Sequence, residues 1–263
     1  MLVPNLDELL EQLNEIAPQL TPTRLMLLNC MASALQVRFD SFLNPQSDLA
    51  TPLFSEYFAS RLLIHHAVVE ERLNKKSFEY IFRDALQNDG KNARITTNKV
   101  HPGADLIVDQ TRISLKTEAS KNIQEAKITI SKFMEARWIR NQDAIGLAQL
   151  ASDRLQEHLS GYDRIMMLRS FNMPGDEVKY ELIEIPHSLL SLASFLQPSD
   201  ITISVGQSGG GSTTILQNNR EAFTLRFDGS VEKVTITNLS VDLCTSHARW
   251  IIPLTISNLE AET

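Results

Sequence analysis

Residues 101–120, HPGADLIVDQTRISLKTEAS, contain two short aliphatic runs, GADLIV and TRISLKT, separated by a polar pair. Aliphatic and β-branched residues favour strands, and the Asp109-Gln110 pair between the runs favours a tight connection. The segment therefore predicts two strands that pair as a hairpin.

Charged residues occupy defined positions on these strands. Because strand side chains alternate between two faces, Ser114, Lys116 and Glu118 are predicted on one face of the second strand. Asp105, on the first strand, is predicted to meet Lys116 across the pair. The ordinary explanation for such a pair is a cross-strand salt bridge, typically worth under about 1 kcal/mol when exposed.

The same residue types also suit phosphodiester hydrolysis. Carboxylates hold Mg²⁺, a hard cation that prefers oxygen ligands and polarises the scissile phosphate. A cation near the attacking water lowers the pKa of that water and stabilises the charge that develops on phosphorus. One Asp, one Lys and one or two further acids supply both parts.

The sequence before the hairpin predicts helices. Apolar residues recur there at three- and four-residue steps, and Pro or Asn-Asp-Gly interrupts each run. The predicted helices cover residues 6–17, 24–43, 50–73 and 78–87.

The sequence after the hairpin predicts two helices and then a series of strands. NIQEAKITISKFMEARWIR, residues 122–140, predicts a helix with an apolar stripe, and residues 143–159 predict another. The stripe consists of Ile123, Ala126, Ile130, Phe133 and Trp138. The predicted strands are 162–171, 180–185, 201–205, 212–216, 222–227, 233–239 and 249–256.

Composition limits the class of protein. With 263 residues, 43% hydrophobic and 22% charged, the chain can bury a full core. Cys30 and Cys244 lie far apart without CxxC spacing, so neither a disulfide framework nor a thiolate zinc site is expected. No apolar run reaches the roughly 18 residues of a membrane helix, and the N-terminus lacks the basic region followed by a hydrophobic one that is typical of a signal peptide. A cytoplasmic protein without a membrane partner is expected.

The net charge of −7 is unevenly distributed. Residues 91–140 contain ten Lys or Arg and five acids, a charge of +5, which leaves −12 for the rest of the chain. A locally basic zone can face phosphates, because salt screens acids more than about 8 Å away. The alternative is a solvated surface without a partner.

The hairpin and the helix before it resemble the PD-(D/E)xK nuclease superfamily, and type II restriction endonucleases in particular. PGADLIV, with Pro102 and Asp105, resembles the PD strand, and SLK at 114–116 resembles the (D/E)xK element. SFEYIFRDAL resembles the upstream helix, whose Glu, here Glu79, stands near the metal. The resemblance covers residues 76–186.

One position departs from that pattern: Ser114 stands where the family has an acid. Some restriction enzymes resemble this arrangement and recruit a Glu from the following helix. Glu125, expected in the first turn of that helix, is the matching candidate, and Glu118 is its rival.

The resemblance implies an α/β, restriction-endonuclease-like fold with a central mixed β-sheet flanked by helices. The N-terminal part is expected to be helical and the C-terminal part β-rich. The expected regions are a helical part at 1–75, a nuclease core at 76–190 and a β-rich part at 191–263, together forming one compact domain.

The resemblance also implies Mg²⁺-dependent, site-specific cleavage of double-stranded DNA. Asp105 and Glu125 are expected to hold the metal, with Glu118 as the substitute. Lys116 is expected to orient or activate the attacking water, and Glu79 to support the metal's surroundings.

Reading a palindromic DNA site favours a two-fold symmetric protein, so a homodimer is expected. Polar residues are expected to reach base edges. The candidates are Gln217, Asn218, Asn219, Arg220 and Arg249. No phosphate-binding lysine loop or GxGxxG motif is present, so a nucleotide cofactor is not expected.

Other interpretations stay open. A repair or mobile-element nuclease of the same fold would share these residues, and a non-catalytic relative would bind DNA without cutting it. GQSGG at 206–210 matches G-x-S-x-G, which makes a serine hydrolase the remote alternative. It would use Ser208 with Asp228 or Asp242 and His247. Two of the candidate residues also have purely structural explanations. Glu79 can pair with Arg83 one helical turn away, and Trp250 can be a buried core residue.

Overall fold

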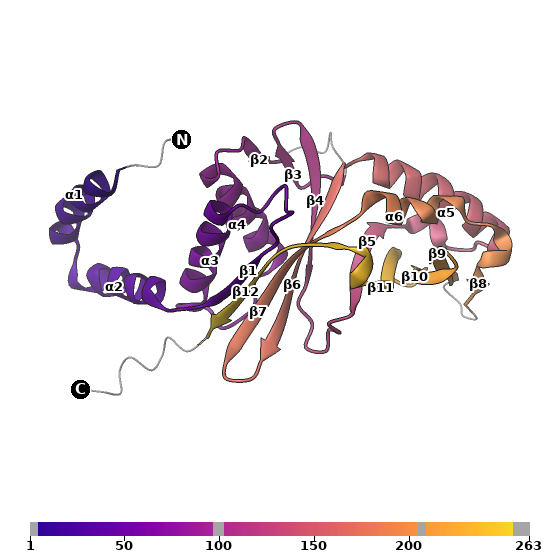
Figure 1. The fold of residues 1–263 in the computed structure, drawn as a ribbon. Coiled ribbons are helices and arrows are strands. Elements are labelled where there is room, and N and C mark those ends of the chain that lie inside the picture. The colour runs from indigo at the N-terminus through magenta and orange to yellow at the C-terminus, as the bar shows by residue number, and fades with distance from the viewer. Residues whose placement is uncertain (1–4, 97–102, 205–208, 255–263) are drawn as a thin grey trace.

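The computed structural model describes residues 5–96, 103–204 and 209–254. Over these residues the fold is mixed α/β, as the sequence predicts, with helices on both sides of a long central sheet (Figure 1). A second, smaller sheet packs on one side of it.

The central sheet has seven strands among the described residues, and at one of its edges the first of these strands along the chain lies beside the last. In spatial order the strands are β1 (Asp40–Leu43), β12 (Thr245–Pro253), β7 (Glu177–Ile185), β6 (Arg164–Met173), β4 (Thr111–Glu118), β3 (Leu106–Val108) and β2 (Ala93–Ile95). Strands β4 and β6 pair in parallel, and the other neighbours are antiparallel, so the sheet is mixed.

The smaller sheet has five strands in the described part of the chain, all antiparallel. In spatial order they are β5 (Lys127–Glu135), β11 (Lys233–Ser240), β10 (Arg220–Asp228), β9 (Gly210–Gln217) and β8 (Thr202–Ile203).

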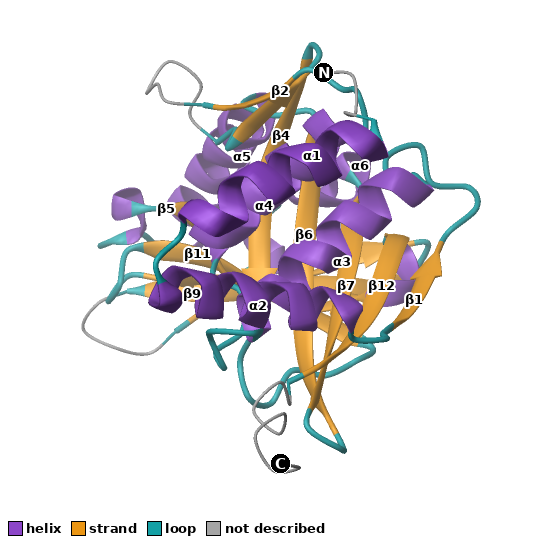
Figure 2. Ribbon diagram, turned by 90° about the vertical axis from the view of Figure 1, so that its left-hand side faces the viewer, coloured by secondary structure: helices purple, strands orange, loops and turns teal. Residues whose placement is uncertain are grey.

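Two hydrophobic cores lie on opposite faces of the central sheet. Helices α3 (Pro52–His66) and α4 (Lys75–Asn88) bury one face, around Phe58 and Trp250. Helices α5 (Ala144–Ser160) and α6 (His187–Ser191) fill the space between the other face and the smaller sheet. Helices α1 (Leu6–Ile16) and α2 (Pro22–Gln36) lie outside α3 and α4 and are nearest the viewer in Figure 2.

The predicted hairpin at residues 103–118 is confirmed. Strands β3 and β4 pair with Leu106 opposite Ile113, and Asp109 turns the chain with a positive φ of 55°. The alternation on β4 is also as predicted, because Ile113 and Leu115 lie in the core under α3 and α4.

The predicted helix over 122–140 is wrong. The segment forms strand β5, followed by a short 3₁₀ turn at Arg137–Ile139. Ile128 and Ile130 alternate with polar Thr129 and Ser131, which is strand periodicity. Pairing with β11 overrides the helical preference of the flanking residues.

Two predicted helices are too long. The helix predicted over 24–43 ends at Gln36, and residues 40–43 form β1, which pairs with β12. The helix predicted over 50–73 ends at His66. In the first case, pairing with a distant strand supplies backbone partners that the local pattern does not reveal.

Candidate active site

The hairpin fixes the position of Asp105. The Asp105 backbone N–H donates to the Ile113 carbonyl at 2.9 Å, which starts the pairing of β3 with β4. The Asp105 Oδ2 atom accepts a hydrogen bond from the Leu115 backbone N–H at 2.7 Å and a longer one from Ser114 Oγ at 3.4 Å. One oxygen of this carboxylate is therefore tied to β4, and the other is available to a cation.

Helix α4 brings a second carboxylate to the same place. Its first turn is capped by the Asn74 side chain, which accepts from the Ser77 N–H. The Lys75 ammonium lies 2.7 Å from Asp105 Oδ1 and 3.7 Å from Glu79 Oε1. Glu79 is buried, and its other oxygen lies 3.2 Å from the Lys76 ammonium. One ammonium group thus bridges the carboxylates of Asp105 and Glu79.

Lys116 belongs to the same group of charges. The pKa of its amine is lowered to about 8, mainly by desolvation and also by the nearby ammonium groups of Lys75 and Lys132, while Asp105 opposes the shift. A desolvated amine close to other ammonium groups holds its charge weakly, and such shifts are typical of functional sites. The structure therefore brings together three of the predicted residues, namely Glu79, Asp105 and Lys116.

The donor set fits a magnesium ion. Asp105 and Glu79 offer carboxylate oxygens around one cation position, and hard divalent ions prefer such ligands. Ser114 is buried, and its hydroxyl donates to Asp105, so this side chain helps to orient that carboxylate.

Glu118 and Glu125 lie in a second cluster, around Arg169. Arg169 is fully buried, and its Nε atom donates to Glu118 Oε2 at 2.7 Å. The other Glu118 oxygen accepts from the Thr129 N–H at 2.7 Å. Glu125 is exposed, and its carboxylate lies 2.6 Å from the Lys179 ammonium, whose hydrogen bond lowers the pKa of Glu125. Glu125 lies just before a strand, so its predicted place in a helix is wrong.

Arg169 also joins the two sheets through the main chain. Its guanidinium donates to the backbone carbonyls of Gln124 at 2.6 Å, Glu125 at 3.0 Å and Lys127 at 2.8 Å. Arg169 lies on β6 of the central sheet, and these carbonyls lead into β5 of the smaller sheet. This cluster fixes the start of β5 beside the end of β4.

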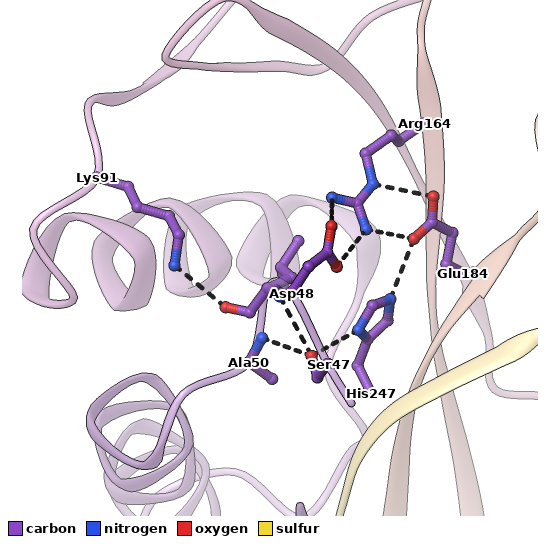
Figure 3. A network of polar contacts seen from close by, with 8 residues as sticks. Ser47, Asp48, Ala50, Lys91, Arg164, Glu184 and His247 are labelled. Atoms are coloured by element: carbon purple, nitrogen blue, oxygen red, sulfur yellow. Dashed lines mark hydrogen bonds and ion pairs between the residues drawn. The ribbon is translucent and has the colours of Figure 1, made fainter. Parts of the chain in front are cut away.

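A third cluster of ligand-type side chains lies near the start of α3. Asp48, Glu184 and His247 bring one ligand atom each within 4.8 Å of one another. Figure 3 shows the Arg164 guanidinium between the two carboxylates. Its Nη1 and Nη2 atoms each donate to one oxygen of Asp48 at 2.9 Å, and its Nε atom donates to Glu184 Oε1 at 2.9 Å. His247 connects Glu184, at 3.1 Å, to the Ser47 hydroxyl, at 2.7 Å. The cation that these carboxylates bind in this structure is the arginine.

Comparison with known proteins identifies the family. The model of the SmaI family, described as type II site-specific deoxyribonuclease, matches residues 13–252. The chain belongs to this family. The type II restriction enzyme SmaI of Serratia marcescens is 34% identical to it over 208 residues, which cover 77% of this chain and 81% of that enzyme. No solved structure matches.

The chain is therefore a type II restriction endonuclease, as the sequence predicts, and a DNA hydrolase. In the described residues of this SmaI-family enzyme, no helix is long and apolar enough to cross a membrane.

The residues predicted to contact DNA lie at two places. Gln217, Asn218, Asn219 and Arg220 form the β9–β10 turn, in which both asparagines have a positive φ, as two-residue hairpin turns require. Arg249 is exposed on β12 and lies over the Phe42 ring, 5.5 Å from its centroid.

The residues of the alternative serine-hydrolase site are dispersed or lie outside the described structure. Ser208 lies outside the described residues. His247 is buried in the Arg164 network, and Asp228 accepts hydrogen bonds from Ser230. Trp250, expected to be a core residue, is fully buried and stacks on Phe58 with centroids 4.7 Å apart.

The smaller sheet of this SmaI-family enzyme also has a polar surface, which was not predicted from the sequence. Hydroxyl side chains and two cations line a hollow of about 580 Å³ on the sheet face that points away from the core. These residues include Thr129, Ser131, Ser212, Arg226, Lys233, Thr235 and Thr237. The available signal was the alternation of polar and apolar residues in KITIS at 127–131, FTLRF at 223–227 and KVTIT at 233–237. This surface adjoins the Arg169 cluster, since Thr129 also bonds Glu118.

Proposed function

We propose that this SmaI-family enzyme cuts double-stranded DNA in a Mg²⁺-dependent reaction at the Glu79–Asp105–Lys116 site. The observation that supports this most is the single ammonium group that bridges Asp105 and Glu79. Two carboxylates that share one cation beside a half-buried lysine form the constellation expected of a PD-(D/E)xK nuclease with Ser114 in the motif-acid position.

Each residue has a chemical role in this proposal. Asp105 and Glu79 hold Mg²⁺, which polarises the scissile phosphate and lowers the pKa of the attacking water. Leu115 N–H and Ser114 Oγ keep Asp105 aimed at the site. The Lys116 amine orients the attacking water and stabilises negative charge on the phosphate, an effect that grows in a buried site.

A further carboxylate completes the metal's surroundings. Glu118 lies two residues beyond Lys116 on the same face of β4, about 7 Å along the strand. Glu125 lies after the end of β4 and is paired with Lys179. We infer that Glu118 is the nearer candidate, and that either acid would have to leave its present partner, Arg169 or Lys179, in order to hold the metal.

The polar face of the smaller sheet is proposed to read the DNA. Hydroxyl groups can donate to and accept from base edges, and Arg226 and Lys233 can contact phosphates. The β9–β10 turn and Arg249 are proposed as additional DNA contacts outside this polar face. A homodimer, with one active site for each strand, matches the symmetry of a palindromic target.

The test is incubation of duplex DNA with the purified enzyme in Mg²⁺ or in EDTA. Discrete fragments that require Mg²⁺ are expected. They should disappear with Lys116→Ala, because the site loses its amine, and persist with Lys121→Ala, an exposed lysine in the same segment. Normal cutting by Lys116→Ala would refute the assignment. Intact DNA that still shifts on a gel would identify a binding protein.

A further inference from the structure

The two N-terminal helices form an arm, defined here as α1 and α2, that projects from the body of the molecule (Figure 1). No residue of α1 is buried, and in α2 only Ala34 is. Helix α2, PTRLMLLNCMASALQ, has apolar residues spread around its circumference with a single charged residue, Arg24, and helices of this kind are normally buried. The arm therefore carries many apolar side chains of the kind found in protein cores, but these side chains are exposed to solvent.

The exposed apolar area on the arm is large. Ten leucine, isoleucine and methionine residues on it are between 37% and 68% exposed. They are Leu6, Leu9, Leu10, Leu13, Ile16, Leu25, Met26, Leu27, Met31 and Leu35. Together they present on the order of 900 Å², more than the 300–600 Å² of a typical monomer's largest patch and close to the roughly 800 Å² that each partner contributes to a stable interface.

Charge narrows the choice of partner. The polar side of α1 carries Asp7, Glu8, Glu11 and Glu15 and no basic residue. Four acids repel both DNA phosphates and anionic lipid headgroups, so the arm does not suit either. A protein surface that offers a matching apolar face suits it.

A second copy of the same chain offers that face. The apolar residues of α1 recur at three- and four-residue steps, the spacing with which helices pack against one another. Two arms related by a two-fold axis bring four helices together, and a four-helix bundle buries such stripes on all its members. The contact is self-complementary, as a closed dimer requires.

We propose that the arm is the dimer interface of this enzyme, with α1 and α2 of two copies packed as a four-helix bundle. This proposal rests on the homodimer of the proposed function and names the surface that forms it.

The test compares the mass in solution of the unaltered chain with that of Leu9→Glu/Leu13→Glu. Sedimentation equilibrium is expected to give twice the 29.6 kDa chain mass for the unaltered protein and a single-chain mass for the double variant, with the dissociation constant raised at least 100-fold. The control is Ile145→Glu on α5, which is 65% exposed and lies outside the arm, and it should stay dimeric. Because α1 contributes no buried residue, the double variant should keep the thermal melting profile of the fold.

The outcomes separate this proposal from the nuclease function. A double variant that stays dimeric, or an unaltered chain that is monomeric both free and on DNA, overturns the arm as the interface. Cleavage by the unaltered chain in Mg²⁺ is scored independently. A dimer that the double substitution dissociates supports the arm even when the unaltered chain does not cleave, and that result refutes only the nuclease site. A dissociated variant that nicks plasmid DNA in one strand supports both.

Discussion

Lys75 occupies the position between Asp105 and Glu79 at which a bound cation would neutralise both carboxylates. Its side chain is 43% exposed and reaches the site from the first turn of α4. Since a metal ion and an ammonium group compete for the same oxygens, Lys75 is expected to move away when the metal binds. Lys76 is paired with Glu79 and lies over the Tyr80 ring, and it provides a comparison with the same charge and a neighbouring position.

Lys75→Met is therefore expected to bind divalent metal about fivefold more tightly than the unaltered enzyme, as expected for a partly exposed ion pair worth roughly 1 kcal/mol. Lys76→Met should change the affinity less. Mn²⁺ binding without DNA, followed by electron paramagnetic resonance, measures this without cleavage. Equal effects of the two substitutions would show that the metal affinity depends only on the net charge of the site, and would contradict a specific role for Lys75.

The two acids of the Arg169 cluster should respond differently to substitution. Glu118→Gln leaves fully buried Arg169 without its closest carboxylate, and this is expected to lower the free energy of unfolding by about 3 kcal/mol. Glu125→Gln removes an exposed pair and should cost under about 1 kcal/mol. Urea unfolding of both variants measures the difference, and similar losses would contradict the burial argument.

At the scale of elements, the strands of the smaller sheet have a buried face and an exposed face. On β10, Phe223, Leu225 and Phe227 point into the core, and Arg226 lies on the polar side with Lys233 of β11. Substitutions on the polar side therefore test DNA contact without disturbing the packing.

Arg226→Ala and Lys233→Ala are each expected to weaken DNA binding several-fold. Each should also reduce the slope of log affinity against log salt concentration by about 1, because one phosphate contact and its released counterion are lost. Arg154→Ala on α5, where the arginine is exposed and paired with Glu157, should leave both quantities unchanged. Titrations in Ca²⁺ or without metal at several salt concentrations measure this. If Arg220→Ala has the larger effect instead, the DNA lies over the β9–β10 turn.

Local patterns predicted the elements that carry the chemistry. The β3–β4 hairpin and α4 were predictable because their periodicity and turn residues lie within about fifteen residues of one another. Strand β5 was missed because KITIS is short and its neighbours favour a helix, while its partner β11 lies a hundred residues away. Lys75 escaped notice because its role depends on Asp105, thirty residues further along.

At the scale of the whole molecule, the Arg164 network joins parts of the chain that no local pattern connects. It links the Ser47–Asp48 loop, β6, β7 and β12, and the Ser47–His247 contact spans 200 residues. Strands β1 and β12 also pair, so the same region closes the early part of the chain against its last described strand. The network should therefore affect global stability.

Its contribution is expected to depend on pH. Burial by itself raises the pKa of Glu184, but hydrogen bonds from His247 and Arg164 outweigh it and lower the pKa to about 2. A carboxyl group with a depressed folded-state pKa stabilises the fold above its ordinary value of 4.5, and this contribution is lost as pH falls from about 4.5 towards 2.

Glu184→Gln should therefore unfold more easily at pH 7, by at most about 3 kcal/mol, and show a flatter loss of stability below pH 4.5. Urea unfolding at pH 7, 5, 4 and 3 measures both effects. Glu157→Gln, whose side chain is 69% exposed on α5, is the control and should follow the unaltered protein. Parallel curves for Glu184→Gln and the unaltered protein would refute the role of the network.

The hydrogen bonds from the Arg169 guanidinium to the main chain at the start of β5 affect which positions of this family can change in sequence. Three of the guanidinium's acceptors are backbone carbonyls, and every amino acid supplies the same carbonyl. Evolutionary drift at Gln124, Glu125 and Lys127 therefore leaves those contacts intact, whereas replacement of the arginine removes all of them at once. Among descendants of a common ancestor, position 169 is expected to stay arginine while the segment that it holds diversifies.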